Sequence, residues 1–369
     1  MGFIKSEERQ REELEEFKRA LLACGSLQRR KGDEDELRRE NRVMGIDEDP
    51  QDKLVCVTSG VSYLGLALVR QLVIRGYSVR LMVDKQEDIE KIREMETTGE
   101  RGGITNRVEA VMGKLTEIES LTAAFNGCRG VFHTSAFADP AGLSGYSKSM
   151  AEMEVRSSEN VIEACARTPS VRKCVLTSSL LACIWRENKS CDLTPVINHE
   201  CWSDEQLCTQ RRLWYALGKL RAEKAAWRVA QERRIRLSAI CPGLITGPDF
   251  CRRNSTPTIA YLKGAEDMYA NGLLATVDVS RLAEAHICVL EALCSTEFGR
   301  YICYDRVVET QDEAERLAQD LGMPTHKISG HTSGNGISQQ SRFHLSNVKL
   351  NRLMSRTMRS CYGECCIGF

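Results

Sequence analysis

Short apolar segments of strand character alternate along this chain with segments that repeat apolar residues at helical spacing. The first unit has an apolar run at 54–58, a turn of small residues at 59–65, and a periodic stretch at 66–75 that Gly76 ends. A second apolar strand follows at 78–83. This order predicts a strand, a tight turn, a helix and a parallel strand, which is how a dinucleotide-binding domain begins.

The alternation continues well beyond this first unit. Further helices are predicted at 88–95, 118–125, 150–167 and from 214 onward, and further strands at 108–112, 130–134, 172–177 and 236–241. Strands that alternate with helices pair in parallel, and the helices cover both faces of the sheet. The predicted fold is therefore α/β, with a Rossmann-like, doubly wound parallel sheet.

The pattern loosens after Pro242. A helix is predicted at 277–294, a late strand at 300–304 and a short helix at 314–321. We expect these parts to form a small C-terminal substrate subdomain, mainly 243–325. It would cover the carboxyl ends of the sheet, where such folds bind their ligands.

The two ends of the chain differ from its folded middle. Residues 1–52 are rich in charged side chains and carry only a weak amphipathic stripe, so we expect one helix and a disordered linker. The folded domain is expected to span 53–325. Residues 326–369 are polar and irregular, which predicts a flexible tail.

Composition argues against several classes of protein. The formal net charge is zero, which gives no reason to expect nucleic acid or an anionic membrane as a partner. No apolar run reaches the roughly 18 residues of a transmembrane segment, and the charged N-terminus lacks the apolar core of a secretory signal. The 17 cysteines form no paired Cys-x-x-Cys motifs, and the 6 histidines are scattered. We therefore expect free thiols in a reducing, cytoplasmic setting and no metal site.

Two weak lipidation patterns lie at the ends of the chain. Met1-Gly2 opens a loose N-myristoylation pattern, and Cys366 opens a C-terminal box that loosely matches a prenylation signal. Bulky Phe3 and small Gly368 fit these patterns poorly. A lipid anchor is therefore not expected.

The clearest chemical feature is a tyrosine and a lysine four positions apart, Tyr215 and Lys219, at the start of a long predicted helix. Residues at this spacing lie on one face of a helix. The ammonium favours the phenolate and would lower the tyrosine pKa from about 10, so that the phenol can pass a proton to a carbonyl oxygen near neutral pH. On its own, the same pair also fits a solvated helix face.

Two other segments would face the same ligand cleft. The hydroxyl run Thr177-Ser178-Ser179 ends a predicted strand, and the turn Cys241-Pro242-Gly243 follows the last main strand. A serine after a strand also commonly caps the next turn, and the second segment also fits an ordinary connection. The tyrosine–lysine pair that follows the hydroxyl run favours a role in the site for that run, whereas the turn on its own fits either a place against the nicotinamide or an ordinary connection.

The turn at 59–65 is a modified version of a phosphate-binding glycine turn. In the usual pattern, glycines let the backbone approach a pyrophosphate and let the helix pack close to the strand. Here the three spaced positions are Ser59, Ser62 and Gly65. Serine is small and adds a hydroxyl donor, so the turn fits either a working nucleotide site or a Rossmann-like domain that has lost its nucleotide.

Taken together, these motifs form a more specific pattern. In chain order they are Thr58…Gly65, Val131-Phe132-His133-Thr134, Thr177-Ser178-Ser179, Glu200-Cys201-Trp202-Ser203-Asp204, Tyr215…Lys219 with Ala222-Glu223-Lys224-Ala225-Ala226-Trp227, and Cys241-Pro242 with Thr246-Gly247-Pro248. Over about residues 53–305 the chain resembles the extended short-chain dehydrogenases, in particular the plant cinnamoyl-CoA reductase and dihydroflavonol reductase branch. It is most similar to a divergent cinnamoyl-CoA reductase-like group in which serine replaces glycine in the turn.

The resemblance implies a catalytic trio of Ser179, Tyr215 and Lys219. Ser179 would hold the substrate carbonyl oxygen, Tyr215 would transfer the proton, and Lys219 would bind the nicotinamide ribose and tune Tyr215. The reduced cofactor would deliver hydride to the carbonyl carbon. A thioester would give a hemithioacetal that collapses to an aldehyde and coenzyme A, whereas reduction of a ketone or aldehyde would stop at the alcohol.

The resemblance also implies a cofactor site along the carboxyl ends of the first strands. Its predicted residues are Ser59, Gly60, Ser62, Tyr63, Leu64, Gly65, Asp84, Lys85, Lys114, Leu115, Thr134, Tyr215, Lys219 and Pro242. Relatives that use the phosphorylated cofactor usually carry arginine at the position of Asp84. A carboxylate there would instead accept hydrogen bonds from free ribose hydroxyls. The family therefore favours NADP, and Asp84 favours NAD.

The chain departs from authentic cinnamoyl-CoA reductases around the catalytic pair and in the adenine pocket. Leu213, Ala216 and Leu217 stand where those enzymes carry Asn, Cys and Tyr, and Lys114 stands where they carry Asp. Three functions therefore compete. The first is an NAD(P)-dependent reductase of a phenylpropanoid-type carbonyl or thioester. The second is an aldehyde or ketone reductase that does not use coenzyme A, and the third is a catalytically weak relative that senses nucleotide or scaffolds a partner. The intact trio favours an enzyme with a small-molecule substrate.

Overall fold

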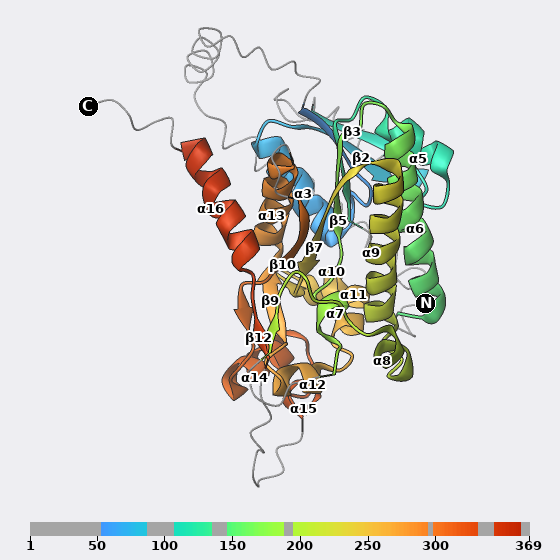
Figure 1. Cartoon of the computed structure of the whole chain (residues 1–369). Helices are drawn as coiled ribbons and strands as arrows, with labels where there is room; N and C mark the ends of the chain where they lie inside the picture. Colours follow the sequence, from blue (N-terminus) through green and yellow to red (C-terminus); the bar gives the residue numbers. More distant parts are fainter. Residues whose placement is uncertain are drawn as a thin grey trace, which may run out of the picture.

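The computed structural model describes residues 53–86, 107–134, 146–187, 195–293, 298–330 and 343–362. The N-terminal segment, the helix predicted at 88–95, and the two candidate lipidation sites, Gly2 and Cys366, lie outside these residues. At the centre of the molecule is a seven-stranded sheet with the strand order β10-β7-β5-β4-β1-β2-β3 (Figure 1). All of its neighbouring strands pair in parallel.

The strands of this sheet lie close to where the sequence predicts them. They are β1 (Leu54–Val57), β2 (Ser78–Val83), β3 (Val108–Met112), β4 (Gly130–His133), β5 (Lys173–Thr177), β7 (Arg236–Pro242) and β10 (Gly299–Cys303). The strand order reverses at β1, which pairs with β2 on one side and with β4 on the other. A reversal of this kind opens a ligand crevice at the carboxyl ends of the strands.

Helices cover both faces of the sheet, as the alternation predicts. On one face lie α3 (Tyr63–Ile74) and α13 (Val279–Ala292), and on the other lie α5 (Ile118–Phe125), α6 (Lys148–Arg167) and α9 (Trp214–Arg233) (Figure 1). Most buried apolar residues belong to two large clusters, one on each side of the sheet. The prediction of a doubly wound α/β fold is confirmed.

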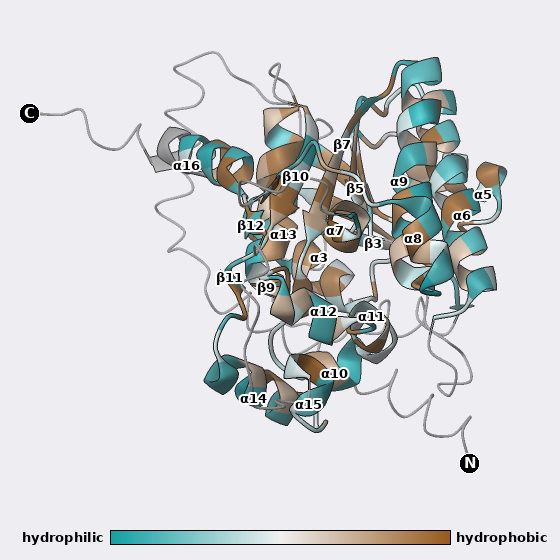
Figure 2. Cartoon of the chain, turned by 60° about the horizontal axis from the view of Figure 1, so that its bottom comes forward, coloured by the Kyte–Doolittle hydropathy of each residue, from teal (hydrophilic) through white to brown (hydrophobic). Residues whose placement is uncertain are grey.

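Two elements expected in the substrate subdomain belong to this central layer instead. Strand β10 is the edge strand next to β7. Helix α13 packs against α3 and against β5, where Lys173 Nζ donates to the carbonyl oxygen of Leu290 at 3.2 Å. Helix α13 is apolar around much of its circumference (Figure 2), because α3 and α16 (Val348–Tyr362) both pack on it. The contacts with α3 and α16 mark α13 as a covered helix rather than part of a lid.

The remaining elements of the predicted subdomain gather around a small mixed sheet of order β11-β9-β8. Its strands are β8 (Leu244–Thr246), β9 (Ala275–Asp278) and β11 (Arg306–Val307). The helices beside it are α10 (Phe250–Arg253), α11 (Ser255–Tyr261), α12 (Ala265–Ala270), α14 (Gln311–Asp320) and α15 (His326–Ser329). Gly243 lets this sheet approach the end of β7, because a Cβ there would lie 2.6 Å from the carbonyl oxygen of Ala275.

The expectation of an irregular tail after residue 325 is wrong for residues 343–362. Strand β12 (His344–Leu345) pairs in parallel with β6 (Val196–Ile197), and α16 packs on α13 and β10. Leu350, Leu353 and Met354 are buried there. Their spacing of three and four positions is that of a helix, but polar neighbours hide it in the sequence.

The Cys201-Trp202-Ser203-Asp204 segment links the chain that follows β5 to α8. Ser203 Oγ donates to the carbonyl oxygen of Leu181 at 2.8 Å and accepts from the amide of Trp185 at 2.9 Å. Asp204 caps α8 (Glu205–Gln210) by accepting from two amides of its first turn.

Within the described parts of the chain, no helix has the length and apolar character that crossing a membrane requires.

Candidate active site

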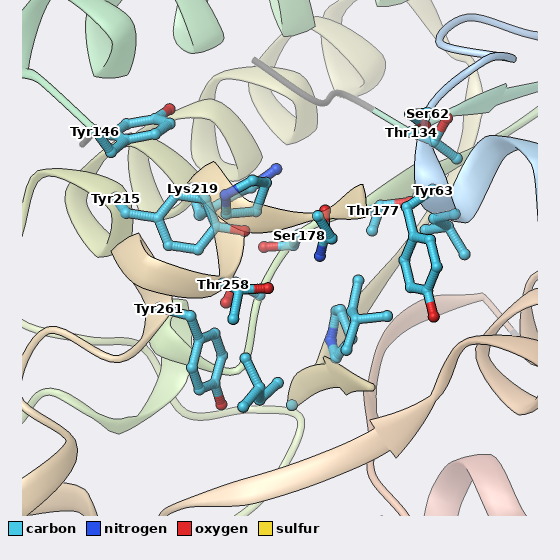
Figure 3. A pocket seen from close by; sticks show the side chains of 18 of the residues that line it. Ser62, Tyr63, Thr134, Tyr146, Thr177, Ser178, Tyr215, Lys219, Thr258 and Tyr261 are labelled. Atoms are coloured by element: carbon cyan, nitrogen blue, oxygen red, sulfur yellow. The ribbon is translucent and has the colours of Figure 1, made fainter. Parts of the chain in front are cut away.

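One cavity at the carboxyl edge of the sheet collects most of the predicted site residues (Figure 3). It lies where α3 begins and where β4, β5 and β7 end, and it is closed from the side by α9 and α11. The predicted residues that line it are Ser62, Tyr63, Leu64, Thr134, Ser179, Tyr215, Lys219 and Pro242. Segments far apart in the sequence thus meet at one place.

The three hydroxyls at the end of β5 have three different partners. Thr177 Oγ1 lies 2.7 Å from Nε2 of His286, and Ser178 Oγ donates to Oε2 of Glu223 at 2.6 Å. Ser179 Oγ accepts from the amide of Leu181 at 3.2 Å. This last contact uses a lone pair of Ser179 and leaves its O–H hydrogen free to donate. Ser179 therefore caps the next turn and still has a donor for a substrate carbonyl oxygen.

Tyr215 and Lys219 both lie on the face of α9 that turns toward the cavity (Figure 3). Lys219 Nζ is 5.7 Å from the ring centroid of Tyr215, and the lysine is almost fully buried. Burial raises the pKa of Tyr215, the ammonium of Lys219 lowers it, and the nearby carboxylate of Glu154 raises it again. The net direction is upward, so the expectation of a lowered tyrosine pKa is wrong.

Two side chains of this site, Glu154 and Tyr146, are absent from the set that the sequence motifs predict. Glu154 Oε1 lies 2.5 Å from Lys219 Nζ, and its other oxygen accepts a short hydrogen bond from the hydroxyl of Tyr146. A signal was present: Glu154 interrupts a stripe of buried residues of α6, Met150, Ser157 and Val161. A charged residue on the buried face of a helix needs a partner.

The turn between β1 and α3 requires glycine at two positions. A Cβ at Gly60 would collide with the side chain of Leu81, and a Cβ at Gly65 would collide with the carbonyl oxygen of Ser59. Ser62 is the N-cap of α3, and its Oγ accepts from the amide of Gly65 at 3.1 Å. The hydroxyl at this position therefore serves the helix, and the serines preserve the tight turn.

The other predicted cofactor residues lie along the same edge of the sheet but do not line the cavity. Asp84 and Lys85 follow β2 and are exposed, and Lys114 and Leu115 follow β3. Lys114 Nζ forms an exposed ion pair with Glu117 at 3.0 Å. The roles of these residues in cofactor binding stay predictions.

The residues at this edge fit a dinucleotide. The N-terminus of the twelve-residue helix α3 opens beside the cavity, and such an end attracts phosphate. Thr134, at the end of β4, is buried, and its Oγ1 has no hydrogen-bond partner among the described residues. A buried hydroxyl without a partner is costly, and a polar group of a bound cofactor would satisfy it.

Two buried histidines stand behind the cavity. His133 Nδ1 lies 3.0 Å from Thr58 Oγ1, and His286 Nδ1 lies 2.7 Å from the carbonyl oxygen of Leu282. Burial lowers the pKa of each to about 4, and the Lys219 ammonium adds to the effect at His133. Both imidazoles are therefore neutral at physiological pH.

This burial predicts acid sensitivity. The folded-state pKa lies below the unfolded value, so the unfolded chain binds more protons, and stability falls as pH drops from about 6.5 toward 4. Each histidine should cost about 2 kcal/mol of unfolding free energy by pH 5. In urea titrations at pH 7.5 and 5, His286→Gln should lose less stability than the wild type. Exposed His344 serves as the control, since His344→Gln should follow the wild type. Equal losses for wild type and His286→Gln would refute the assignment.

Residues 56–328 match the sequence model of the 3-beta hydroxysteroid dehydrogenase/isomerase family. The chain belongs to this family. It is 34% identical to cinnamoyl-CoA reductase 1 of Petunia hybrida over 308 residues, which cover 82% of this chain and 86% of the relative. It is 30% identical to tetraketide alpha-pyrone reductase 1 of Arabidopsis thaliana over 266 residues, or 70% and 78% of the two chains. The resemblance to extended short-chain dehydrogenases is thereby confirmed.

Solved structures of two reductases have the same fold. Vestitone reductase from alfalfa superposes with a TM-score of 0.57 at 20% identity, over 85% of this chain and 99% of that one. Yeast methylglyoxal/isovaleraldehyde reductase in complex with NADPH gives a TM-score of 0.60 at 20% identity, over 82% and 93%. The family and the curated reductase relatives together identify the chain as an NAD(P)-dependent oxidoreductase.

Proposed function

We propose that this protein reduces the carbonyl group of a phenylpropanoid-type substrate with NADH or NADPH. The observation that carries the proposal is the meeting of Ser179, Tyr215 and Lys219 in one cavity, beside the N-terminus of α3. These three residue types supply a hydrogen-bond donor, a proton donor and a fixed positive charge. A bound nicotinamide would supply the hydride.

Each side chain has a defined task in this reaction. Ser179 donates to the carbonyl oxygen and orients it, and Tyr215 transfers its phenolic proton to the same oxygen. Lys219 holds the ribose hydroxyls and stabilises the phenolate that Tyr215 becomes. The buried surroundings of Lys219 strengthen this electrostatic interaction.

The substrate class rests on the relatives and on one polar group of the cavity. Thr258, on α11, lines the cavity and is buried, and its Oγ1 has no hydrogen-bond partner among the described residues. An oxygen substituent on an aromatic substrate would supply that partner. The residues that replace Asn, Cys and Tyr near the catalytic pair, Leu213, Ala216 and Leu217, are buried and apolar. They favour the alternative of an aldehyde or ketone reductase that does not use coenzyme A.

A paired substrate assay tests the proposal and separates these alternatives. Calorimetry with NADH and NADPH first establishes cofactor binding. Hydroxycinnamoyl-CoA esters are then compared with the matching aldehydes and ketones. Reduction of a thioester releases a free thiol, whereas reduction of an aldehyde or ketone releases none. Cofactor binding with no turnover of any substrate would refute the proposal and favour a nucleotide-sensing role.

The preference between NADH and NADPH depends on Asp84 and Lys85, at the end of β2. We expect NADH to bind at least as well as NADPH, because the Asp84 carboxylate accepts from ribose hydroxyls and repels a phosphate. Asp84→Arg should shift the ratio of dissociation constants toward NADPH by about tenfold or more, since it adds a charge-assisted contact. Calorimetry with both cofactors measures this ratio.

A cation near Asp84 is the alternative phosphate partner. Arg80 is held elsewhere: its Nε pairs with Glu109 at 2.9 Å, and its Nη1 donates to the carbonyl oxygens of Ala124 and Asn126. Lys85 is thus the candidate, and Lys85→Ala is the matched control. Tight wild-type binding of NADPH that Lys85→Ala abolishes would show that Asp84 points away from the ribose.

A further inference from the structure

A carboxylate inside the active site contacts the lysine of the catalytic pair and is linked to its tyrosine through a second tyrosine. One oxygen of Glu154 forms the 2.5 Å ion pair with Lys219, and both side chains are at least 95% buried. The other oxygen accepts from Tyr146, whose ring packs edge-on against Tyr215 with centroids 5.0 Å apart (Figure 3). Glu154 thus reaches the lysine directly and the tyrosine through Tyr146.

Close packing of α6 against α9 creates this arrangement. Gly218 precedes Lys219, and a Cβ there would lie 3.0 Å from Cα and Cβ of Ala151 and 3.1 Å from the hydroxyl of Tyr146. Two small residues therefore let the helices approach, and Glu154 lies about one turn beyond Ala151 on α6. The glycine also leaves room for the Tyr146 hydroxyl. The fold thus places the carboxylate beside the catalytic lysine.

A contribution to folding stability does not explain why the ion pair of Glu154 and Lys219 is buried. Burying two charges costs desolvation energy that their attraction often fails to repay, so a buried ion pair commonly adds little net stability. Its charge, however, acts strongly on neighbours in a site of low dielectric constant. The effect on Tyr215 is therefore the consequence to consider.

We propose that Glu154 is a positioning residue that fixes the ammonium of Lys219 and keeps Tyr215 as the neutral, proton-donating phenol that carbonyl reduction requires. The inference rests on the proposed roles of Tyr215 and Lys219. An ammonium alone pulls Tyr215 toward the phenolate, which accepts protons and so serves alcohol oxidation. Burial of the phenol and the Glu154 carboxylate both oppose that pull, and the carboxylate is the part that a charge substitution can remove. Glu154 thereby adapts the site to the reductive direction.

The charges around Tyr215 agree with this assignment. Burial works against the ammonium, but the Glu154 carboxylate and the Tyr215 phenol together outweigh it, so the pKa of Lys219 is raised. Burial raises the pKa values of Tyr146 and Tyr261, the two phenols that interact with Tyr215 from the segment just before α6 and from α11. His133, behind the lysine on β4, is neutral above a pH of about 4. Lys219 and Glu154 thus form the ion pair among these groups.

Ionisation of Tyr215 should affect reduction and oxidation in opposite ways. In reduction the Tyr215 O–H bond breaks and its proton goes to the substrate oxygen, so the rate falls when the phenol ionises. In oxidation the substrate O–H bond breaks and the phenolate takes the proton, so the rate rises when the phenol ionises. A lower Tyr215 pKa therefore slows reduction and speeds oxidation at a given alkaline pH.

Glu154→Gln removes the charge, keeps the shape, and retains an acceptor for Tyr146. The ionisation of Tyr215 is measured as a difference in phenolate absorbance across a pH titration. The titration of Tyr215→Phe is subtracted from that of the wild type, and the titration of Glu154→Gln/Tyr215→Phe is subtracted from that of Glu154→Gln. The Tyr215 midpoint should fall by about one pH unit or more in Glu154→Gln. In Glu154→Gln, the rate of reduction should begin to fall at a lower pH than in the wild type. The rate of oxidation should likewise begin to rise at a lower pH. Glu154→Asp should keep the wild-type midpoint.

Two further variants make the test selective. Glu159→Gln removes the same charge from the exposed side of α6, where Glu159 pairs with Arg228, and should leave the midpoint unchanged. Tyr146→Phe keeps the carboxylate and removes its hydrogen-bond donor, so the midpoint should stay or rise. This second variant decides the matter should Glu154→Gln not fold, because a fall in Tyr146→Phe contradicts the proposal.

The outcomes separate this inference from the proposed function. An unshifted midpoint in folded Glu154→Gln, with reduction and oxidation slowed equally, would mean that Glu154 is only structural, while the roles of Tyr215 and Lys219 would stand. Full turnover by Tyr215→Phe would instead overturn the proposed function itself.

Discussion

Replacing Tyr215 with phenylalanine should lower kcat by about 10²- to 10⁴-fold, the usual contribution of a positioned proton donor. The affinity for the cofactor should stay nearly unchanged, because the substitution deletes only the hydroxyl. The edge-on packing of the ring against Tyr146, with an interplanar angle of 80°, needs no hydroxyl and should persist. Steady-state kinetics and calorimetric cofactor titration of the same preparation test both parts.

Two further variants show whether the loss of turnover is specific to the proton donor. Lys219→Ala should damage both turnover and cofactor affinity, since the lysine is assigned to the ribose as well as to the phenol. Tyr77→Phe removes a tyrosine hydroxyl that donates to Glu291 at 3.3 Å, away from the cavity, and should leave turnover unchanged. Retention of full activity by Tyr215→Phe on every accepted substrate would show that the assigned mechanism is wrong.

The parts of the site that the sequence predicts are those carried by local patterns. Tyr215 and Lys219 are visible because four positions on a helix place two residues on one face. Ser179 is visible because a hydroxyl that follows a parallel strand faces the ligand cleft. The turn at 59–65 is recognisable because its small residues stand between a strand and a helix.

The parts of the site and fold that the sequence does not predict depend on contacts between distant segments. Lys219 and Glu223 are four positions apart and by spacing alone form a plausible pair. In the structure Lys219 pairs with Glu154 of α6, and Glu223 pairs with Arg300 of β10. Similarly, α13 looks like a lid helix until its contacts with α3 are known. Partner choice follows from packing, which no local pattern encodes.

We expect the largest loss of stability when the buried ion pair of Glu223 and Arg300 is broken. Arg300 Nε lies 2.6 Å from Glu223 Oε1, and the glutamate is fully buried. Glu223 also accepts from Ser178 at 2.6 Å, and the Arg300 guanidinium lies 3.5 Å from the ring centroid of Trp202. These contacts join α9, β10, the end of β5 and the Cys201-Trp202-Ser203-Asp204 segment directly behind the cavity.

Glu223→Ala should lower the free energy of unfolding by about 3–5 kcal/mol, because it leaves the Arg300 guanidinium buried without its counter-charge. The double variant Glu223→Ala/Arg300→Ala should lose less than the sum of the two single variants, since it removes both charges. Urea unfolding of the three variants measures this coupling. Where Glu223→Ala still folds, turnover should also fall, because Ser178 loses its partner beside Ser179.

A surface pair on the same helix provides the control for this experiment. Arg228 Nη2 lies 2.7 Å from Glu159, but 57% of the arginine side chain and 35% of the glutamate side chain are exposed. Exposed ion pairs are screened by water and contribute about 0–1 kcal/mol. Arg228→Ala should therefore be nearly neutral, although its ion pair has a distance similar to that of the buried one. A loss in Glu223→Ala as small as that in Arg228→Ala would mean that water reaches the Arg300 guanidinium, and that the carboxyl end of β5 is held by its backbone contacts with β7 instead.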